Sequence, residues 1–166
     1  AKKPFVVDLQ GKSIAIINVA ENEFSTIGAT PYGANPLDFI ENSYDIKEYK
    51  NNCDFVIVIV HGGREHYELP SPNFKKTLRF FADCGADAVL AHHTHCVSGY
   101  EIYKDTPIFY GLGNFHFKSL SDKKNTSLWN TGLAVKLILL KSGAINFELY
   151  PYRQCRGVKN SIEMLS

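Results

Sequence analysis

The chain has no hydrophobic run long enough to cross a membrane and no block of charge of one sign. Its most apolar stretches, residues 55–60 and 133–140, have the length of strands, whereas a membrane helix needs about 20 residues. The 18 basic and 17 acidic residues are scattered and leave a net charge of +1, so the basic patch of a nucleic-acid binder is missing. We therefore expect no transmembrane segment and no nucleic-acid partner. No signal-peptide core follows residues 1–4, and the compartment stays open.

Cysteine is sparse and irregularly spaced. Cys53, Cys84, Cys96 and Cys155 form no Cys-x-x-Cys pair, which favours reduced, structural thiols over a disulfide framework. The 166 residues, 45% of them hydrophobic, are enough for one folded core, and no repeat or linker divides them. We expect a single domain over residues 1–166.

Alternating strand and helix signals predict the fold class. Apolar runs predict strands over residues 4–9, 12–19, 54–60 and 86–90. The second run is rich in β-branched residues and fits a strand buried on both faces. Asn35-Pro36 and Ser71-Pro72 each place a capping residue before proline, which predicts helices from 36 to about 51 and from 72 to about 85. The helical stripes expected from spacing are Leu37, Ile40 and Tyr44 in the first helix, and Phe74, Leu78 and Phe81 in the second.

Two hairpins follow the last of these strands. Residues 97–103 and 107–110 are expected to pair around 104–106, and residues 131–140 and 144–152 around 141–143. The predicted fold class is α/β, with a mostly parallel sheet flanked by helices and an antiparallel β tail.

Three histidines fall within four positions in the run His92-His93-Thr94-His95, directly after a predicted strand. His61 closes another predicted strand, and the carboxyl ends of parallel strands meet at one edge of a sheet, where ligands bind. His93 and His95 point the same way if the backbone there is extended. Imidazoles suit Zn, Fe, Mn, Ni or Cu. We expect His61, His93 and His95 to bind a metal, with an exposed histidine cluster as the alternative.

Other polar residues surround this cluster in the sequence. Glu65 is expected to orient a ligand histidine or to act as a general acid or base. His92 and Asn114, the latter after the turn Gly111-Leu112-Gly113, join Glu65 as candidate catalytic residues. His66 is a candidate wall residue. Glu21, at the end of a buried strand, is either a carboxylate for the site or the start of a solvated loop.

Several motifs occur together in a recognisable order: HGGREHY at 61–67, CGADAV at 84–89, HHTH at 92–95 and PIFYGLGNF at 107–115. Over residues 19–117 the chain resembles the CapA-type capsule-biosynthesis family. This family is associated with poly-γ-glutamate capsule synthesis and belongs to the calcineurin-like metallophosphoesterase superfamily. The resemblance implies half of a four-layer αββα sandwich and association with the cell envelope. It also implies that His61 is the metal ligand at the end of a central strand and that His93 and His95 complete a two-metal site of Mn, Fe or Zn. Such a pair of ions would bind a phosphate oxygen and lower the pKa of a bridging water.

The sequence departs from the family pattern in its first half. The family's Gly-Asp pair and its Asn-x-Glu motif are not found. Asp8 superficially resembles the aspartate of the Gly-Asp pair but lacks the preceding glycine. Ala91 stands where superfamily members often have glycine. The chain therefore resembles the C-terminal half of such a domain, and a site of three histidines would hold one metal.

Three hypotheses follow. The first is a metal-dependent hydrolase of metallophosphoesterase type in capsule or poly-γ-glutamate biosynthesis, acting on an anionic polymer or a phosphoester. The second is a non-catalytic or truncated CapA-like module of an envelope polymer-synthesis complex, which forms a homo-oligomer or pairs with a complementing N-terminal half. The third is a mononuclear metal-binding protein without hydrolytic activity.

Overall fold

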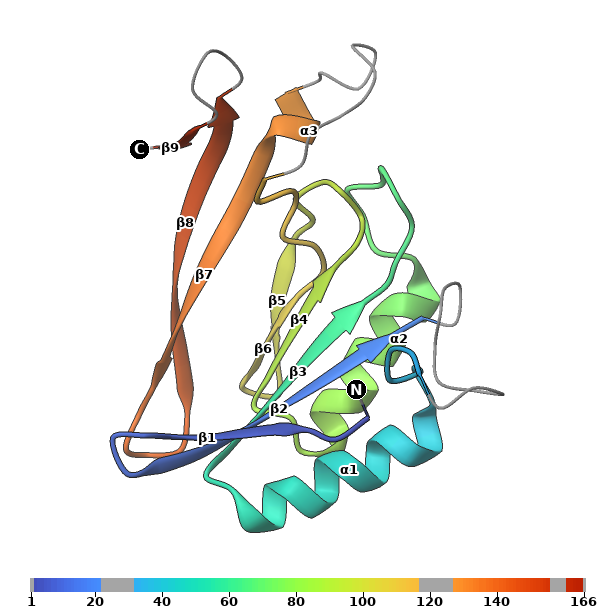
Figure 1. The fold of residues 1–166 in the computed structure, drawn as a ribbon, viewed down its shortest axis with the longest axis vertical. Coiled ribbons are helices and arrows are strands. Elements are labelled where there is room, and N and C mark those ends of the chain that lie inside the picture. Colours follow the sequence, from blue (N-terminus) through green and yellow to red (C-terminus); the bar gives the residue numbers. More distant parts are fainter. Residues whose placement is uncertain (1, 22–31, 117–126, 156–160, 166) are drawn as a thin grey trace.

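The computed structural model describes residues 2–21, 32–116, 127–155 and 161–165. It consists of a helical layer, a main sheet and a smaller second sheet (Figure 1). The fold class predicted from the sequence, a mostly parallel sheet flanked by helices with an antiparallel tail, is confirmed.

The main sheet has the strand order β1-β2-β3-β4-β6-β5. Its strands are β1 (Phe5–Leu9), β2 (Lys12–Ala20), β3 (Phe55–His61), β4 (Ala88–His92), β5 (Tyr100–Tyr103) and β6 (Thr106–Phe109). The pairs β2–β3, β3–β4 and β4–β6 are parallel, whereas the edge strands β1 and β5 pair antiparallel. The carboxyl ends of β2, β3 and β4 therefore lie at one edge of the sheet.

Helices α1 (Phe39–Asn52) and α2 (Pro72–Cys84) cover one face of the main sheet (Figure 1). The predicted start of α2 is confirmed, since the Ser71 hydroxyl accepts a hydrogen bond from the Phe74 amide and Pro72 opens the helix. Gly85 ends the helix in the left-handed conformation, with φ of 114°. The predicted stripe is also confirmed, because Phe74, Leu78 and Phe81 are buried against the sheet.

The predicted start and buried face of α1 are wrong. Asp38, not Asn35, caps the helix, because its carboxylate accepts from the Ile40 and Glu41 amides. Residues 35–37 instead run beside the end of β2, where the Leu37 amide donates to the Ala20 carbonyl. Ile40 and Tyr44 face solvent, and the buried residues of the helix are Asn42 and Ile46.

The second sheet packs against the other face of the main sheet. Its strands are β7 (Thr131–Leu139), β8 (Ile145–Cys155) and β9 (Ser161–Met164), all antiparallel, and the short helix α3 (Ser127–Asn130) precedes them. The sequence did not predict α3 or β9 and ended β8 too early. Ile14, Phe55 and Ala88 of the main sheet are buried with Ile145 of the second sheet. Helices, main sheet and second sheet make successive layers, as half of an αββα sandwich requires.

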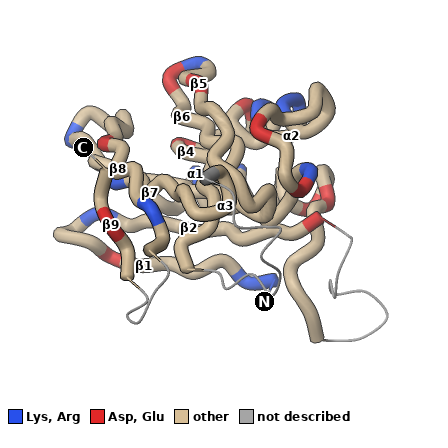
Figure 2. Tube along the Cα trace, turned by 90° about the horizontal axis from the view of Figure 1, so that it is seen from above, with Lys and Arg blue, Asp and Glu red and all other residues tan. Residues whose placement is uncertain are grey.

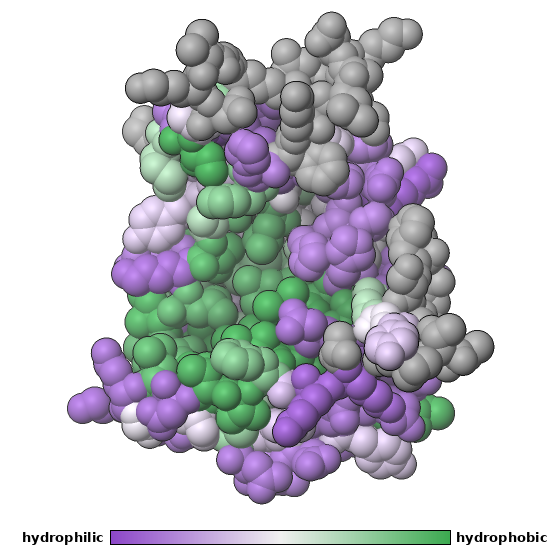
Figure 3. All heavy atoms as spheres, viewed as in Figure 1, coloured by the Kyte–Doolittle hydropathy of each residue, from purple (hydrophilic) through white to green (hydrophobic). Residues whose placement is uncertain are grey.

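The contact between the two sheets is incomplete. Six apolar side chains packed there are only partly buried: Val7, Ile16, Ile57, Leu90, Leu137 and Leu139. The space-filling view shows this apolar area open on one face of the molecule (Figure 3). Strand β2 is buried on both faces only in part, since Ile14 is buried against the second sheet whereas Asn18 on the same face is exposed.

Charge and cysteine follow the sequence predictions. Lys and Arg are spread over several elements and form no single patch among the described residues (Figure 2). All four cysteines are free. No helix within the described residues is long and apolar enough to span a membrane.

Candidate metal centre

The parallel pairing of β3 and β4 brings two histidines together, as the sequence predicted. His61 and His92 are register partners at the ends of these strands. Their Nδ1 atoms lie 3.2 Å apart, so one ring donates a hydrogen bond and the other accepts it. Burial, together with the neighbouring rings of His61 and His93, lowers the pKa of His92 to about 4. His92 is therefore neutral near pH 7.

The loop that carries His93 and His95 is not extended. The sequence prediction that the two rings point the same way had assumed an extended backbone. His93 has φ of 111° and His95 has φ of 58°, and both values lie in a region that side chains other than glycine rarely adopt. The two rings nevertheless converge, with centroids 6.0 Å apart. Backbone strain of this kind persists only where the surrounding structure holds it.

Several contacts hold this loop in place. The His92 carbonyl accepts from the Gly62 amide at 2.9 Å, and the Thr94 carbonyl accepts from the His66 amide at 2.7 Å. The buried Thr94 hydroxyl donates to the Cys96 carbonyl at 2.9 Å. A Cβ atom on Gly111 would lie 2.6 Å from that hydroxyl. The histidine loop therefore packs directly against the glycine turn at residues 111–113.

Glu65, His93 and His95 form a group that can hold a metal ion. One ligand atom from each residue lies within 4.8 Å of the others. The Glu65 Oε1 atom is 4.0 Å from His93 Nε2 and 3.9 Å from His95 Nε2. A carboxylate and two imidazoles fit a divalent transition metal and do not select one. The sequence placed Glu65 beside the ligands, whereas the structure puts its carboxylate among the possible ligand atoms.

His61 lies next to this group and faces two of its neighbours. Its ring centroid is 4.6 Å from that of His93 and 4.8 Å from that of His92. The structure thus brings His61, Glu65, His92, His93 and His95 together, and these residues are called the histidine edge below. Its rings gather at the carboxyl end of the main sheet, as the sequence predicted.

Asn114 contacts the histidine edge directly. Its Nδ2 group donates to the carbonyls of His95 and Trp129, at 3.3 and 3.0 Å, so its Oδ1 atom faces His95 Nδ1 at 2.7 Å as an acceptor. His95 Nδ1 therefore carries the proton, and Nε2, on the side of Glu65, keeps its lone pair. Asn114 selects the tautomer of His95 that can bind a metal.

Sequence reasoning missed Trp129 and Gln154, whereas it named His66 as a wall residue. The Trp129 ring stacks on His95 with centroids 4.9 Å apart, and His66 packs against both rings. Gln154 of β8 donates to the carbonyls of Asn114 and Trp129. The signals were weak, because Trp129 follows a polar stretch and Gln154 is one polar residue near the end of a strand.

Glu21, which the sequence left open, lies against the loop that bears Glu65. Its Oε2 atom accepts a hydrogen bond from the Gly63 amide at 3.0 Å. A Cβ atom on Gly62 would lie 2.7 Å from Glu21 Cγ, so glycine permits this close approach. His116, by contrast, is exposed.

The fold and the histidine edge define an α/β protein with a candidate metal centre at the carboxyl end of its sheet. Residues 1–119 match the family model "Bacterial capsule synthesis protein PGA_cap". This match covers more than half of the chain, and the protein belongs to that family. The resemblance inferred from the motifs is confirmed.

Two relatives illustrate the extent of the similarity in sequence. The chain is 35% identical over 144 residues to the PGA biosynthesis protein CapA of Bacillus subtilis (strain 168), covering 87% of this chain and 34% of that protein. It is 41% identical over 68 residues to the capsule biosynthesis protein CapA of Bacillus anthracis, covering 41% of this chain and 16% of that protein. The chain thus spans about a third or less of the length of these relatives.

One solved structure illustrates the similarity in fold. A hypothetical protein from Thermus thermophilus superposes with a TM-score of 0.59 and 18% identity, covering 90% of this chain and 61% of that chain. This likeness concerns the fold alone.

Proposed function

We propose that the chain carries the metal site of a metallophosphoesterase-type hydrolase in capsule or poly-γ-glutamate biosynthesis, with an anionic polymer or a phosphoester as substrate. The observation that carries the proposal is the convergence of the carboxylate of Glu65 with the rings of His93 and His95. Membership of a capsule-synthesis family gives the biological setting.

Each residue of the histidine edge has a distinct role in the proposal. His93, His95 and Glu65 would hold a divalent ion such as Mn, Fe or Zn, with His61 beside His93. Such an ion supplies a Lewis acid and lowers the pKa of bound water. The His61–His92 pair holds a proton between two Nδ1 atoms, and His92 stays neutral near pH 7, so in this proposal it acts as a hydrogen-bonding group rather than as a charged acid.

Metal content measured on protein purified without a histidine tag is the first test. Elemental analysis should find at least one transition metal per chain in the wild type and none in His93→Ala. His116→Ala, which removes an exposed histidine, should keep the metal. A second assay follows hydrolysis of bis-p-nitrophenyl phosphate by the metal-loaded wild type and by His92→Gln. A wild type without metal would refute the proposal, and a metal-loaded but inactive wild type would leave the two non-catalytic hypotheses.

A second candidate function is a non-catalytic module that associates through its open apolar face. The observation that favours it is the set of partly buried side chains between the two sheets (Figure 3). The partner would be a second copy or a complementing N-terminal half that covers these side chains. Light scattering at several protein concentrations tests self-association, and a monomer at all of them would leave only the complementing half.

A further inference from the structure

Two residues beyond the segment matched by the family model reach the candidate metal centre. Trp129 belongs to α3 and Gln154 to β8, whereas the matched segment ends at residue 119. Both side chains are buried, Trp129 with 5% and Gln154 with 7% of its surface exposed. The second sheet therefore contributes to a site whose motifs all lie in the main sheet and its loops.

Gln154 fixes the position of Asn114. Its Nε2 group donates to the Asn114 carbonyl and to the Trp129 carbonyl, each at 3.3 Å. The Trp129 carbonyl also accepts from Asn114 Nδ2 at 3.0 Å. The Gln154 amide thus ties the backbone of Asn114 to the carbonyl that orients the Asn114 side chain.

Trp129 fixes the plane of the His95 ring. The indole stacks on the imidazole at an interplanar angle of 27°, and the His66 ring lies 5.6 Å from the indole and 5.9 Å from the His95 ring. A ring confined in this way cannot rotate without displacing its neighbours. Asn114 sets which His95 nitrogen carries the proton, and Trp129 sets where the other nitrogen points.

We propose that Gln154 and Trp129 are positioning residues that hold His95 in its metal-binding tautomer and orientation, so that the second sheet completes the site. The proposal deepens the function above and rests on it only for the metal. The state of the His95 ring is measurable in the metal-free protein, so the two ideas can fail separately.

The first test is the tautomer of His95 in metal-free protein. Long-range ¹H–¹⁵N spectra of the histidine side chains are recorded at pH about 8.5, where an ordinary histidine is neutral. His95 is assigned by the loss of its signals in His95→Ala. The wild type should show a protonated Nδ1 and an unprotonated Nε2. Gln154→Met, which keeps the length of the side chain and removes its amide, should show exchange between the two tautomers.

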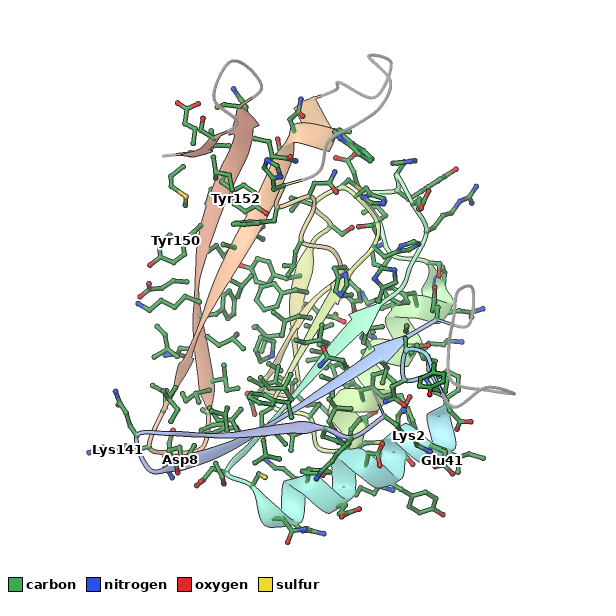
Figure 4. All side chains as sticks on the ribbon, in the orientation of Figure 1. Lys2, Asp8, Glu41, Lys141, Tyr150 and Tyr152 are labelled. Atoms are coloured by element: carbon green, nitrogen blue, oxygen red, sulfur yellow. The ribbon has the colours of Figure 1, made fainter. Side chains whose placement is uncertain are left out.

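The matched control is Tyr152→Phe. Tyr152 lies on the same strand, two residues away, and is also buried (Figure 4). Removing its hydroxyl leaves Gln154, Asn114 and Trp129 in place. Its His95 spectrum should match that of the wild type.

The second test is Co²⁺ affinity by calorimetry. Changes in residues that orient metal ligands typically cost 10–100-fold in affinity, so Gln154→Met should bind about tenfold more weakly or worse, and Tyr152→Phe within about twofold of the wild type. If Gln154→Met does not fold, Trp129→Leu replaces it, because this change removes the stack and keeps the backbone carbonyl. Trp129→Leu should then weaken Co²⁺ binding to a similar degree.

The outcomes separate the alternatives. A wild-type His95 protonated on Nε2 would overturn the positioning role. So would variants with lower melting temperature but unchanged tautomer and unchanged Co²⁺ affinity, since Gln154 and Trp129 would then only stabilise the fold. A wild type with the expected tautomer and no Co²⁺ binding would support the positioning role and refute the metal-dependent function.

Discussion

The helix-covered face of the main sheet and the histidine edge are built from adjacent residues with opposite properties. Val60 and Ala91 are completely buried beneath the helices, and the next residue of each strand is His61 or His92. The helix-covered face holds apolar side chains in regular structure. The histidine edge and its neighbour His66 include three residues at positive φ, namely His66, His93 and His95. Backbone strain is thus present at the edge and not in the strands of the helix-covered face, and the packed face supplies the stability that maintains it.

The polar groups of the two regions differ in the same way. On the helix side, the Glu101 carboxylate of β5 accepts two hydrogen bonds from Arg79 of α2, at 2.8 and 2.6 Å, and one from Tyr110. At the histidine edge, the Glu65 carboxylate stays 3.9–4.0 Å from two imidazoles, beyond hydrogen-bond distance. A hydrogen-bonded carboxylate stabilises a fold, whereas the Glu65 carboxylate makes no hydrogen bond to these two rings and faces the unprotonated Nε2 of His95, so it is available for a cation.

The largest expected effect is a loss of stability when a buried side chain of the helix-covered face is removed. Phe81→Ala removes a fully buried ring of α2 and should lower the free energy of unfolding by about 3–5 kcal/mol. Urea unfolding in metal-free buffer measures this. Phe80→Ala, on the same helix but 36% exposed, should cost clearly less. Equal losses for the two variants would contradict the assignment of the stabilising core to the helix-covered face.

A smaller effect concerns the ion pair of the helix side. The hydrogen bonds from the Arg79 guanidinium, together with that from the Tyr110 hydroxyl, lower the pKa of Glu101 from its ordinary value of 4.5 to about 2. A carboxyl with a lowered folded-state pKa stabilises the protein above its unfolded pKa and loses this contribution as pH falls from about 5 to about 2. Glu101→Gln should cost about 1.5–3 kcal/mol at pH 7, the usual range for hydrogen bonds to charged groups.

The measurement for this pair is urea unfolding from pH 7 down to the lowest pH at which the protein folds. The wild type and Glu101→Gln should converge in stability as pH falls. Glu163→Gln, an exposed carboxyl on β9, serves as the control and should track the wild type. Parallel curves for Glu101→Gln and the wild type would show that the ion pair contributes no pH dependence.

At the histidine edge, the close approach of Gly111 offers a sharper comparison. A Cβ atom there would lie 2.6 Å from the Thr94 hydroxyl and 3.0 Å from the Cys96 carbonyl. Gly111→Ala should therefore displace the histidine loop and destabilise the protein by about 1–3 kcal/mol, the usual cost of overpacking. Metal content should fall as well. Gly99→Ala is the control, since its Cβ atom would have no neighbour within 4 Å, and equal behaviour of the two variants would contradict the packing described.

Much of this arrangement was predictable from the sequence, because it follows from strand periodicity. Apolar runs ending in His61 and His92 predict parallel strands that deliver both rings to one edge, and the register confirms it. Ser71-Pro72 and Gly85 predicted both ends of α2. Local signals of this kind act within a few residues and compete with no other structure.

The features that the sequence did not predict all depend on contacts between distant segments. The start of α1 is set by the contact of Leu37 with Ala20, which lies far away in sequence, and this contact overrides the Asn35-Pro36 signal. The positive φ values of His93 and His95 have no local signal, since the loop that carries them packs against Gly111, which is distant in sequence. Trp129 and Gln154 reach the site through the second sheet. Contacts between distant segments cannot be inferred from periodicity or capping.

The smallest expected effect tests the strain itself. Glycine normally destabilises regular structure by about 0.5–1 kcal/mol relative to alanine, because it loses more backbone entropy on folding. At His93, with φ of 111°, the order should reverse, and His93→Gly should be more stable than His93→Ala by about 1 kcal/mol. Both variants lack the imidazole and should lose the metal, so unfolding is compared in the presence of a chelator. At His61, at the end of β3 and outside the positive-φ set, glycine should be the less stable replacement. If glycine is also the less stable replacement at His93, the histidine edge is not strained, and the contrast with the helix-covered face reduces to composition alone.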